Sequence, residues 1–444
     1  MVSGAVTDIA KRADERAGRF SILLASWSQP IFSSGKWGRM SGEQKNGSQH
    51  YDVIVVGLGA MGSAALYQLS KHDARVLGID QFDPPHNRGS SHGETRLTRL
   101  GIGEGRHYVP FAIRSHQIWR ELEAATGENL LTVTGGLFFS GEEQGSPVHG
   151  AADFIGETVA AAKAFEIEHE VLDHHQLEER FPQFRYSGRE RGYYEPDAGF
   201  VAPEKCIETQ LRCAQNQGAE VRTQEPVHQV EPLSDGTARV VTDSGEYTAQ
   251  RVILSAGSWL NRFLPAMHHE KFKVYRQSLY WVDVEGSIED FLPDRFPVFI
   301  RTDRLRDDVL YGFPANDGPE GGIKIATEYY GSTCDPAVGC TPVTAEEQQR
   351  MLEFSSRFLR VGARCIRGTS CLFTVTPDGE FVIDHHPDHS QLILASPCSG
   401  HGFKHSAAVG ELLAAMGLGL PCELDRSHFG MGRFSERPRS SASH

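Results

Sequence analysis

The sequence lacks the features that mark membrane-spanning or nucleic-acid-binding proteins. No segment approaches the roughly 20 consecutive apolar residues needed to cross a bilayer, so no membrane association is expected. Basic side chains number 44 against 58 acidic ones, and the net charge of −14 argues against a partner with a phosphate backbone. This charge still permits a local basic pocket for a small carboxylate.

Cysteine pairs of the kind that bind zinc are also missing. The eight cysteines form no CxxC pair and show no zinc-finger spacing, which favours free thiols in a reducing, cytoplasmic setting. Two histidine clusters, His174-His175 and His385-His386 with His389, stand beside Asp, Pro and Gln in sequence typical of loops. We therefore predict no metal site.

Residues 1–50 differ from the rest of the chain. They are rich in Ser and Gly and have no sustained hydrophobic period. A positive segment followed by a long apolar run is absent, so no secretory signal is predicted. A mitochondrial-type leader is the alternative, but Asp8, Asp14 and Glu15 count against it. We expect an extension without regular structure.

Regular structure is expected to begin at Tyr51. Residues 52–56 are apolar on both faces, as in a buried parallel strand, and a helical pattern covers 63–71. A second apolar strand over 75–79 ends at Asp80. These segments predict a βαβ unit.

The glycine-rich turn of this unit predicts a dinucleotide site. It reads Gly57-Leu-Gly59-Ala-Met61-Gly62, which has the GxGxxG spacing. The first glycine permits a tight turn, the second lets backbone approach a pyrophosphate, and the third lets helix and strand pack closely. The helix N-terminus attracts the phosphates, and Asp80 can accept hydrogen bonds from a ribose. The turn alone does not distinguish FAD from NAD.

Later segments indicate that the nucleotide domain is discontinuous. Apolar strands at 251–257 and 391–395 run into glycines, whereas alternating runs such as 278–284 suit a mixed or antiparallel sheet. The predicted fold class is α/β, with a Rossmann-like FAD-binding domain and a substrate domain. We assign 51–130, 190–270 and 365–425 to the first, 131–189 and 271–364 to the second, and 426–444 to a tail.

Several longer motifs occur together along the chain. They are Gly89-Ser-Ser-His92-Gly-Glu-Thr-Arg96-Leu-Thr-Arg99, Gly103-Glu-Gly-Arg-His-Tyr-Val-Pro110, Tyr275-Arg-Gln277, Leu310-Tyr311-Gly-Phe313, Gly322-Ile-Lys324, Cys371-Leu-Phe373-Thr, Phe381-Val-Ile-Asp384 and Ser399-Gly400-His-Gly402-Phe403-Lys404. In this order they resemble the monomeric sarcosine oxidase and N-methyltryptophan oxidase family of FAD-dependent amine oxidases, which also includes pipecolate oxidases. The similarity runs from about residue 51 to about residue 420.

The resemblance implies a set of cofactor-binding residues. Cys371 matches the cysteine that forms a thioether to the flavin, so covalent FAD is expected. His92 and Arg96 match residues packed on the flavin face. The glycines of the 400–404 loop permit close backbone approach to the ring. The full predicted set is Gly57, Gly59, Met61, Gly62, Asp80, His92, Arg96, Cys371, Gly400, Gly402 and Phe403.

The resemblance also implies catalytic residues. Arg99 and Lys404 match the pair that holds the substrate carboxylate, an arrangement that suits a guanidinium fork and a second point charge. Lys324 matches the lysine that activates oxygen, and Tyr311 an aromatic residue of the pocket. The chain departs from the family at two pocket positions, where Glu328 replaces a histidine and Phe373 a tyrosine. These changes put sarcosine itself in question and leave the oxidase chemistry intact.

The predicted function is oxidation of a secondary amino acid, N-methyl or cyclic, to an imine with production of hydrogen peroxide. The partners are then a small amino acid and oxygen, and the protein is expected to be a monomer. A flavin-dependent dehydrogenase that uses another electron acceptor is the main alternative. A nucleotide-binding module without catalysis and an NAD dehydrogenase are less consistent with the motifs.

Overall fold

The computed structural model describes residues 49–141, 153–303, 308–318 and 320–434. Nearly all of the extension expected at 1–50, and the end of the tail expected at 426–444, lie outside these residues. The described ranges contain seven α-helices: α2 (Ala60–Leu69), α3 (Val109–Thr126), α4 (Phe154–Ala164), α5 (His174–Arg180), α6 (Pro203–Asn216), α7 (Ala345–Ser355) and α8 (Ser406–Leu418).

The first large sheet is built from three separate parts of the sequence. Its strands β9, β2, β1, β12 and β19 pair in parallel, and antiparallel strands β10, β11 and β18 extend it. The eight strands are β1 (Gln49–Val56), β2 (Val76–Ile79), β9 (Glu220–Arg222), β10 (Val227–Pro232), β11 (Ala238–Thr242), β12 (Gly245–Leu254), β18 (Val382–His386) and β19 (His389–Ser396).

The parallel strands of this sheet end at one edge. Val56 is in register with Ile79 on one side and Leu254 on the other, and Leu254 is in register with Leu394. The segments that follow these four strands therefore meet at the carboxyl edge, where ligands of open α/β sheets bind.

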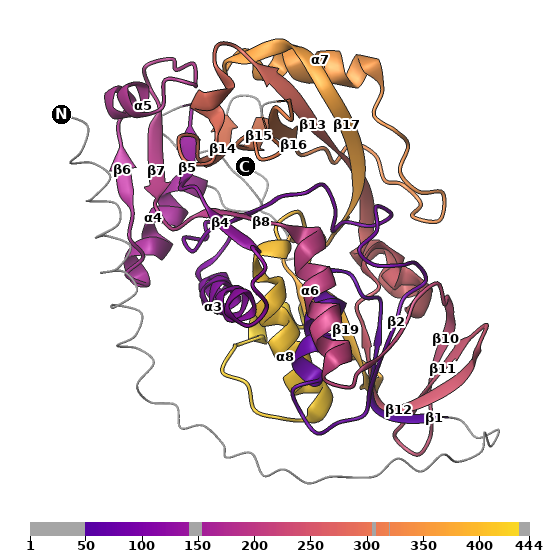
Figure 1. Ribbon diagram of the computed structural model, residues 1–444. Helices are drawn as coiled ribbons and strands as arrows, with labels where there is room; N and C mark the ends of the chain where they lie inside the picture. Colours follow the sequence, from indigo (N-terminus) through magenta and orange to yellow (C-terminus); the bar gives the residue numbers. More distant parts are fainter. Residues whose placement is uncertain (1–48, 142–152, 304–307, 319, 435–444) are drawn as a thin grey trace, which may run out of the picture. The chain divides into compact units, whose positions relative to one another are not determined.

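Helices pack against this sheet through buried faces that are mostly apolar. In α8, Ala407, Val409, Leu412 and Leu413 are buried. The helix packs against α2 and α3, and Figure 1 shows it beside α3. The neighbouring α6 is amphipathic and also packs on α2. Together these helices fix the position of the loops that enter and leave the carboxyl edge.

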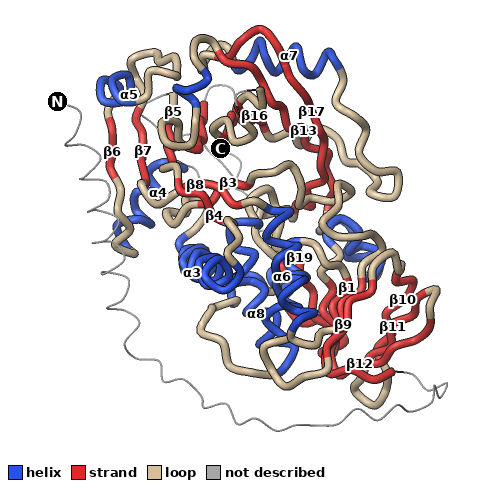
Figure 2. Tube along the Cα trace, in the orientation of Figure 1, coloured by secondary structure: helices blue, strands red, loops and turns tan. Residues whose placement is uncertain are grey.

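The second large sheet is mostly antiparallel, and its order is β17-β13-β16-β15-β14-β5-β7-β6 (Figure 2). Only β14 and β5 run parallel among its pairs. Its strands are β5 (Gly136–Ser140), β6 (Glu170–Leu172), β7 (Arg191–Glu195), β13 (Lys273–Val284), β14 (Val298–Asp303), β15 (Asp308–Phe313), β16 (Ile323–Thr327) and β17 (Val361–Val375). A short third sheet joins β3 (Arg96–Thr98), β8 (Gly199–Val201) and β4 (Leu131–Val133).

The predicted α/β fold is confirmed, including the βαβ unit and the mixed second sheet. The helix expected over 63–71 begins earlier, at Ala60, directly within the glycine turn. The second sheet includes β7 and all of β17, although residues 190 onward and 365 onward were assigned to the nucleotide domain. The sheet to which each strand belongs is decided by pairing between strands far apart in the sequence. The local hydrophobic period of a strand does not indicate its pairing partners.

One local prediction is wrong. His174 and His175 open α5, and His385, His386 and His389 lie on β18 and β19, so these clusters are not in loops. In α5 the capping box formed by Asp173 and Gln176 begins a helix that the sequence reading took for a loop. Within the described ranges, no three His, Cys, Asp or Glu side chains are grouped to hold a metal ion. Likewise, no helix of the described chain is both long and apolar enough to traverse a membrane.

Candidate active site

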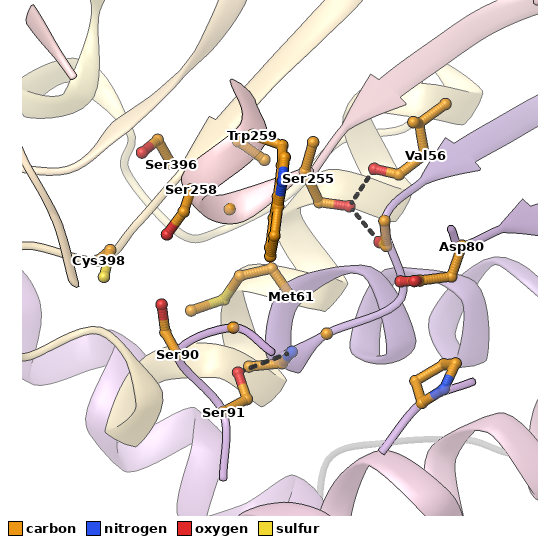
Figure 3. A pocket seen from close by; sticks show the side chains of 18 of the residues that line it. Val56, Met61, Asp80, Ser90, Ser91, Ser255, Ser258, Trp259, Ser396 and Cys398 are labelled. Atoms are coloured by element: carbon orange, nitrogen blue, oxygen red, sulfur yellow. Dashed lines mark hydrogen bonds between the residues drawn. The ribbon is translucent and has the colours of Figure 1, made fainter. Parts of the chain in front are cut away.

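The glycine turn after β1 is shaped by close contacts. Gly57 has φ of +90°, and a Cβ added there would lie 2.6 Å from the Ser255 carbonyl oxygen. A Cβ on Gly62 would lie 1.8 Å from the Gly57 carbonyl oxygen, so this glycine lets α2 pack on the turn. The Ser255 hydroxyl donates to the Gly57 carbonyl at 2.8 Å and fixes the turn from β12 (Figure 3).

The turn leaves most of the start of α2 open to a ligand; the Ser91 hydroxyl accepts from the Ala60 N–H at 3.4 Å (Figure 3). The N-cap residue Gly59 supplies no side-chain cap, and the first turn of the helix has no acidic residue. Backbone N–H groups and the positive end of the helix dipole therefore face the cavity described below, as a pyrophosphate requires.

Asp80 lies at the end of β2 on the same edge. Its Oδ2 accepts from the Leu58 N–H at 2.7 Å and its Oδ1 from the Phe82 N–H at 2.8 Å. Burial raises the pKa of this carboxyl, and the two backbone N–H groups oppose that effect. Each carboxylate oxygen has a second lone pair, so Asp80 can still accept from ribose hydroxyls.

These two features line one cavity, whose empty space together with the part open to solvent is about 1320 Å³. Figure 3 shows Val56 and Asp80 on one side of it and Ser90 and Cys398 on the other, with Met61 between them. The predicted cofactor residues that line it are Gly57, Gly59, Met61, Asp80, Arg96, Gly400, Gly402 and Phe403. The glycine turn, the open start of α2 and Asp80 in this lining fit a dinucleotide such as FAD.

A second cavity, of about 740 Å³, shares a wall with the first. Arg96, Phe373, Gly400 and Phe403 line both. The two cavities are therefore adjacent. All six predicted catalytic residues line the second cavity: Arg99, Tyr311, Lys324, Glu328, Phe373 and Lys404.

Two buried cations converge on one carboxylate in this second cavity. Arg99 Nη2 lies 2.6 Å from Glu104 Oε2, and Lys404 Nζ lies 3.1 Å from Glu104 Oε1. The three side chains are at most 5% exposed, so solvent screens these interactions little. Burial lowers the pKa of Lys404 to about 8 while Glu104 opposes this, so Lys404 is charged at neutral pH.

Glu104 was missed by the sequence reading. It lies in the quoted Gly103-Glu104-Gly105 motif, and the only available signal was an acid placed a few residues after Arg99. Its ion pair with Lys404 joins positions 300 residues apart. The Glu104 carboxylate therefore pairs with both Arg99 and Lys404 in this structure.

Lys324 extends from β16 into the same cavity. Its Nζ donates to the Gly93 and Thr95 carbonyl oxygens, each at 2.7 Å, and contacts Thr95 Oγ1 at 3.0 Å. Burial, with a smaller contribution from Arg96, holds the pKa of Lys324 well below its usual range. Such an amine can take up a proton when negative charge develops beside it.

Glu328 and Tyr311 define another side of the cavity. Glu328 accepts a hydrogen bond from the Tyr330 hydroxyl at 2.9 Å, just after the end of β16. Tyr311 on β15 is half-buried and packs against the apolar cluster of Leu279 and Phe373. Desolvation raises the pKa of its phenol above the ordinary value. The cavity is otherwise lined mostly by apolar side chains, including Phe154, Leu279 and Phe313.

The remaining predicted residues lie near the cavities without lining them. Gly62 packs beneath the turn, as expected for the third glycine. Among the described residues that line either cavity, His92 and Cys371 are absent. Burial lowers the pKa of His92 to about 4. Cys371 lies two residues before Phe373 on β17, so the two side chains point to the same strand face.

Comparison with known proteins identifies relatives over the same region. Residues 52–416 match the family described as FAD dependent oxidoreductase. The monomeric sarcosine oxidase of Streptomyces avermitilis is 38% identical over 84% of this chain and 94% of that protein. The N-methyl-L-tryptophan oxidase of Yersinia pestis is 32% identical over 86% of this chain and 99% of that protein.

Solved structures show the same fold at lower identity. NikD, described as an unusual amino acid oxidase essential for nikkomycin biosynthesis, gives a TM-score of 0.73 at 23% identity, covering 86% of this chain and 98% of that one. L-proline dehydrogenase from P. horikoshii gives a TM-score of 0.71 at 18% identity, covering 87% and 98%.

Proposed function

Because the chain belongs to the family of FAD-dependent oxidoreductases, we propose that it oxidises a secondary amino acid, N-methyl or cyclic, with oxygen as the electron acceptor. The observation that supports this most strongly is the shared wall between the two cavities. Arg99 and Lys404, which we propose hold the substrate carboxylate, line the cavity next to the one that we propose holds the dinucleotide. An amino acid bound there presents its N–C–H group to the cofactor.

The lining of the first cavity supports the cofactor-binding residues of this proposal. The start of α2 would hold the pyrophosphate, Asp80 a ribose, and Arg96, Phe373 and Phe403 the ring. FAD, when bound, accepts a hydride equivalent from the amine and passes the electrons to oxygen. Covalent attachment through Cys371 is part of the proposal. Its support is the strand face shared with Phe373 and the nearby Arg96 and Lys324, which favour the thiolate against the burial that raises its pKa to about 11.

Arg99 and Lys404 bind the substrate carboxylate in this proposal. Glu104 now occupies both cations, so an incoming carboxylate must replace it or share them. The exchange of one carboxylate for another keeps both cations paired, which avoids the cost of leaving buried charge uncompensated. Fixed charges at this end orient the substrate, and orientation supplies much of the rate acceleration.

The amine must be neutral when the hydride leaves, because its lone pair forms the imine. Glu328 is the carboxylate placed to attract a cationic amine into the cavity. The same charge stabilises the ammonium form, so substrate deprotonation becomes part of the reaction. For an N-methyl substrate, amino acid, oxygen and water give formaldehyde, the primary amino acid and hydrogen peroxide.

Two further properties belong to the proposal. We place the protein in the cytoplasm, because all eight cysteines are free thiols in the structure. We also propose that it acts as a monomer, as the name of its Streptomyces avermitilis relative says of that protein.

The peroxide yield separates the oxidase from the alternative dehydrogenase. In air, the purified yellow protein should form one hydrogen peroxide per amino acid oxidised, tested with sarcosine, N-methyltryptophan, pipecolate and proline. Acid precipitation should leave the colour on the polypeptide. Turnover that needs an artificial acceptor and gives little peroxide would instead favour the dehydrogenase, and a colourless pellet would exclude the covalent bond.

A further inference from the structure

A row of three side chains crosses the second sheet beside the cavity. Lys324 on β16 is paired with Trp281 on β13, and Trp281 is paired with Arg367 on β17. The Lys324 Nζ lies 5.6 Å and the Arg367 Cζ lies 3.7 Å from the Trp281 ring centroid. The Trp281 ring therefore lies between the buried amine of Lys324 and the surface guanidinium of Arg367.

Glu94, from a distant part of the sequence, contacts both Trp281 and Arg367 of this row. Its Oε2 accepts from the Trp281 Nε1–H at 3.1 Å, and its Oε1 lies 2.5 Å from Arg367 Nη2. The Glu94 backbone has φ of +71°, a conformation that residues with side chains rarely adopt. Its N–H donates to the Glu204 carboxylate at 3.1 Å, which holds the same segment from α6.

The segment that these contacts fix is the one that binds Lys324. The Lys324 Nζ donates to the carbonyl oxygens of Gly93 and Thr95, the residues on either side of Glu94. Without the Glu94 side chain, the segment would lose its contacts with Trp281 and Arg367. The positive-φ backbone conformation would then be less restrained, and the Gly93 and Thr95 carbonyls would no longer be fixed toward the Lys324 Nζ. An exposed ion pair contributes little to the free energy of unfolding. The pair between Glu94 and Arg367 is therefore better explained by its effect on the conformation of this segment.

We propose that Glu94 is a positioning residue for Lys324. Through Trp281 and Arg367 it holds the Gly93 and Thr95 carbonyls in place, and these hold the Lys324 Nζ in the cavity. This inference rests on the proposed function for the role of Lys324 toward oxygen. The placement of the Nζ itself can be measured without turnover.

The test compares Glu94→Ala with Glu170→Ala in the holoenzyme. Glu170 is a matched control, because it pairs with Arg180 at 2.8 Å on the surface, and Arg180 lies 4.0 Å from the Tyr194 ring centroid. The first readout is the rate of reductive methylation at Lys324, followed by peptide mapping. We expect Glu94→Ala to raise it roughly tenfold while the rate at Lys404 stays unchanged.

The second readout is the split between the two half-reactions. Glu94→Ala should slow reoxidation of the cofactor by oxygen roughly tenfold and change its anaerobic reduction less than about twofold. Glu94→Gln, whose amide oxygen can still accept from Trp281, should recover most of both effects. Glu170→Ala should match the wild type.

Three results would overturn the inference. One is an unchanged methylation rate at Lys324 in Glu94→Ala. Another is an equal rise at Lys324 and Lys404, which would show general loosening of the fold. The third is equal slowing of both half-reactions. If Lys324→Met reoxidises at the wild-type rate, the oxygen role of Lys324 fails, whereas the methylation result still decides whether Glu94 positions the amine.

Discussion

Replacement of Lys324 by methionine is expected to slow reoxidation of the cofactor by roughly 10²- to 10³-fold, the usual cost of removing one preorganised polar group from a reacting charge. The Nζ is buried and held by three oxygen acceptors, so it is fixed in position before oxygen arrives. Methionine has similar length and fits an apolar cavity, but it has no N–H group and no amine that can take up a proton as negative charge develops on the oxygen.

Stopped-flow measurement of the two half-reactions tests this prediction. Anaerobic reduction by substrate should change only a few-fold, because Lys324 is not one of the cations that hold the carboxylate. Lys273→Met is the control, since Lys273 also lies in the second sheet but is exposed. Comparable slowing of reduction and reoxidation would show that Lys324 acts through the general structure of the site.

Replacement of Glu104 by glutamine is expected to destabilise the protein and to increase its affinity for small carboxylic acids. The change leaves Arg99 and Lys404 buried without their shared anion, and loss of one partner of a buried ion pair costs about 3–5 kcal/mol. A bound carboxylate restores the missing charge. We therefore expect small carboxylic acids to bind roughly 10- to 100-fold more tightly than to the wild type.

The pKa of Lys404 decides the pH at which carboxylate binding should be measured. Its pKa is about 8 in the wild type, where Glu104 raises it against the effect of burial, so the glutamine variant lowers it further. Carboxylate binding should therefore weaken as pH rises, starting at a lower pH in the variant. Titration of the flavin spectrum at pH 6.5, with thermal unfolding in parallel, is the test, and Glu285→Gln at the exposed pair with Arg185 is the control. Unchanged affinity would show that Glu104 does not compete with the ligand.

The parts of the fold that depend on a local sequence pattern could be predicted. The βαβ unit could be predicted because apolar strands, a GxGxxG turn and Asp80 occur in one continuous stretch. The carboxyl edge then follows from the rules of parallel sheets. The six catalytic positions came from the family resemblance, and the structure brings all of them to one cavity.

Features that depend on contacts between residues far apart in the sequence could not be predicted from the sequence alone. Nothing local indicates that Glu104 lies between Arg99 and Lys404, because the fold alone brings residues 104 and 404 together. The same holds for Glu94, whose partners Trp281 and Arg367 are 187 and 273 residues away. Membership of β7 in the second sheet likewise depends on its pairing with β5 and β6.

The central claim is that a carboxylate held by Arg99 and Lys404 sets the reacting C–H bond against the cofactor. It is tested most directly by anaerobic reduction with an amino acid and with its decarboxylated analogue, such as sarcosine with dimethylamine, N-methyltryptophan with N-methyltryptamine, or pipecolate with piperidine. For the pair whose acid is the substrate, we predict saturable bleaching of the flavin by the amino acid and at least roughly 10²-fold slower bleaching by the amine. Equal rates for acid and amine would contradict the account.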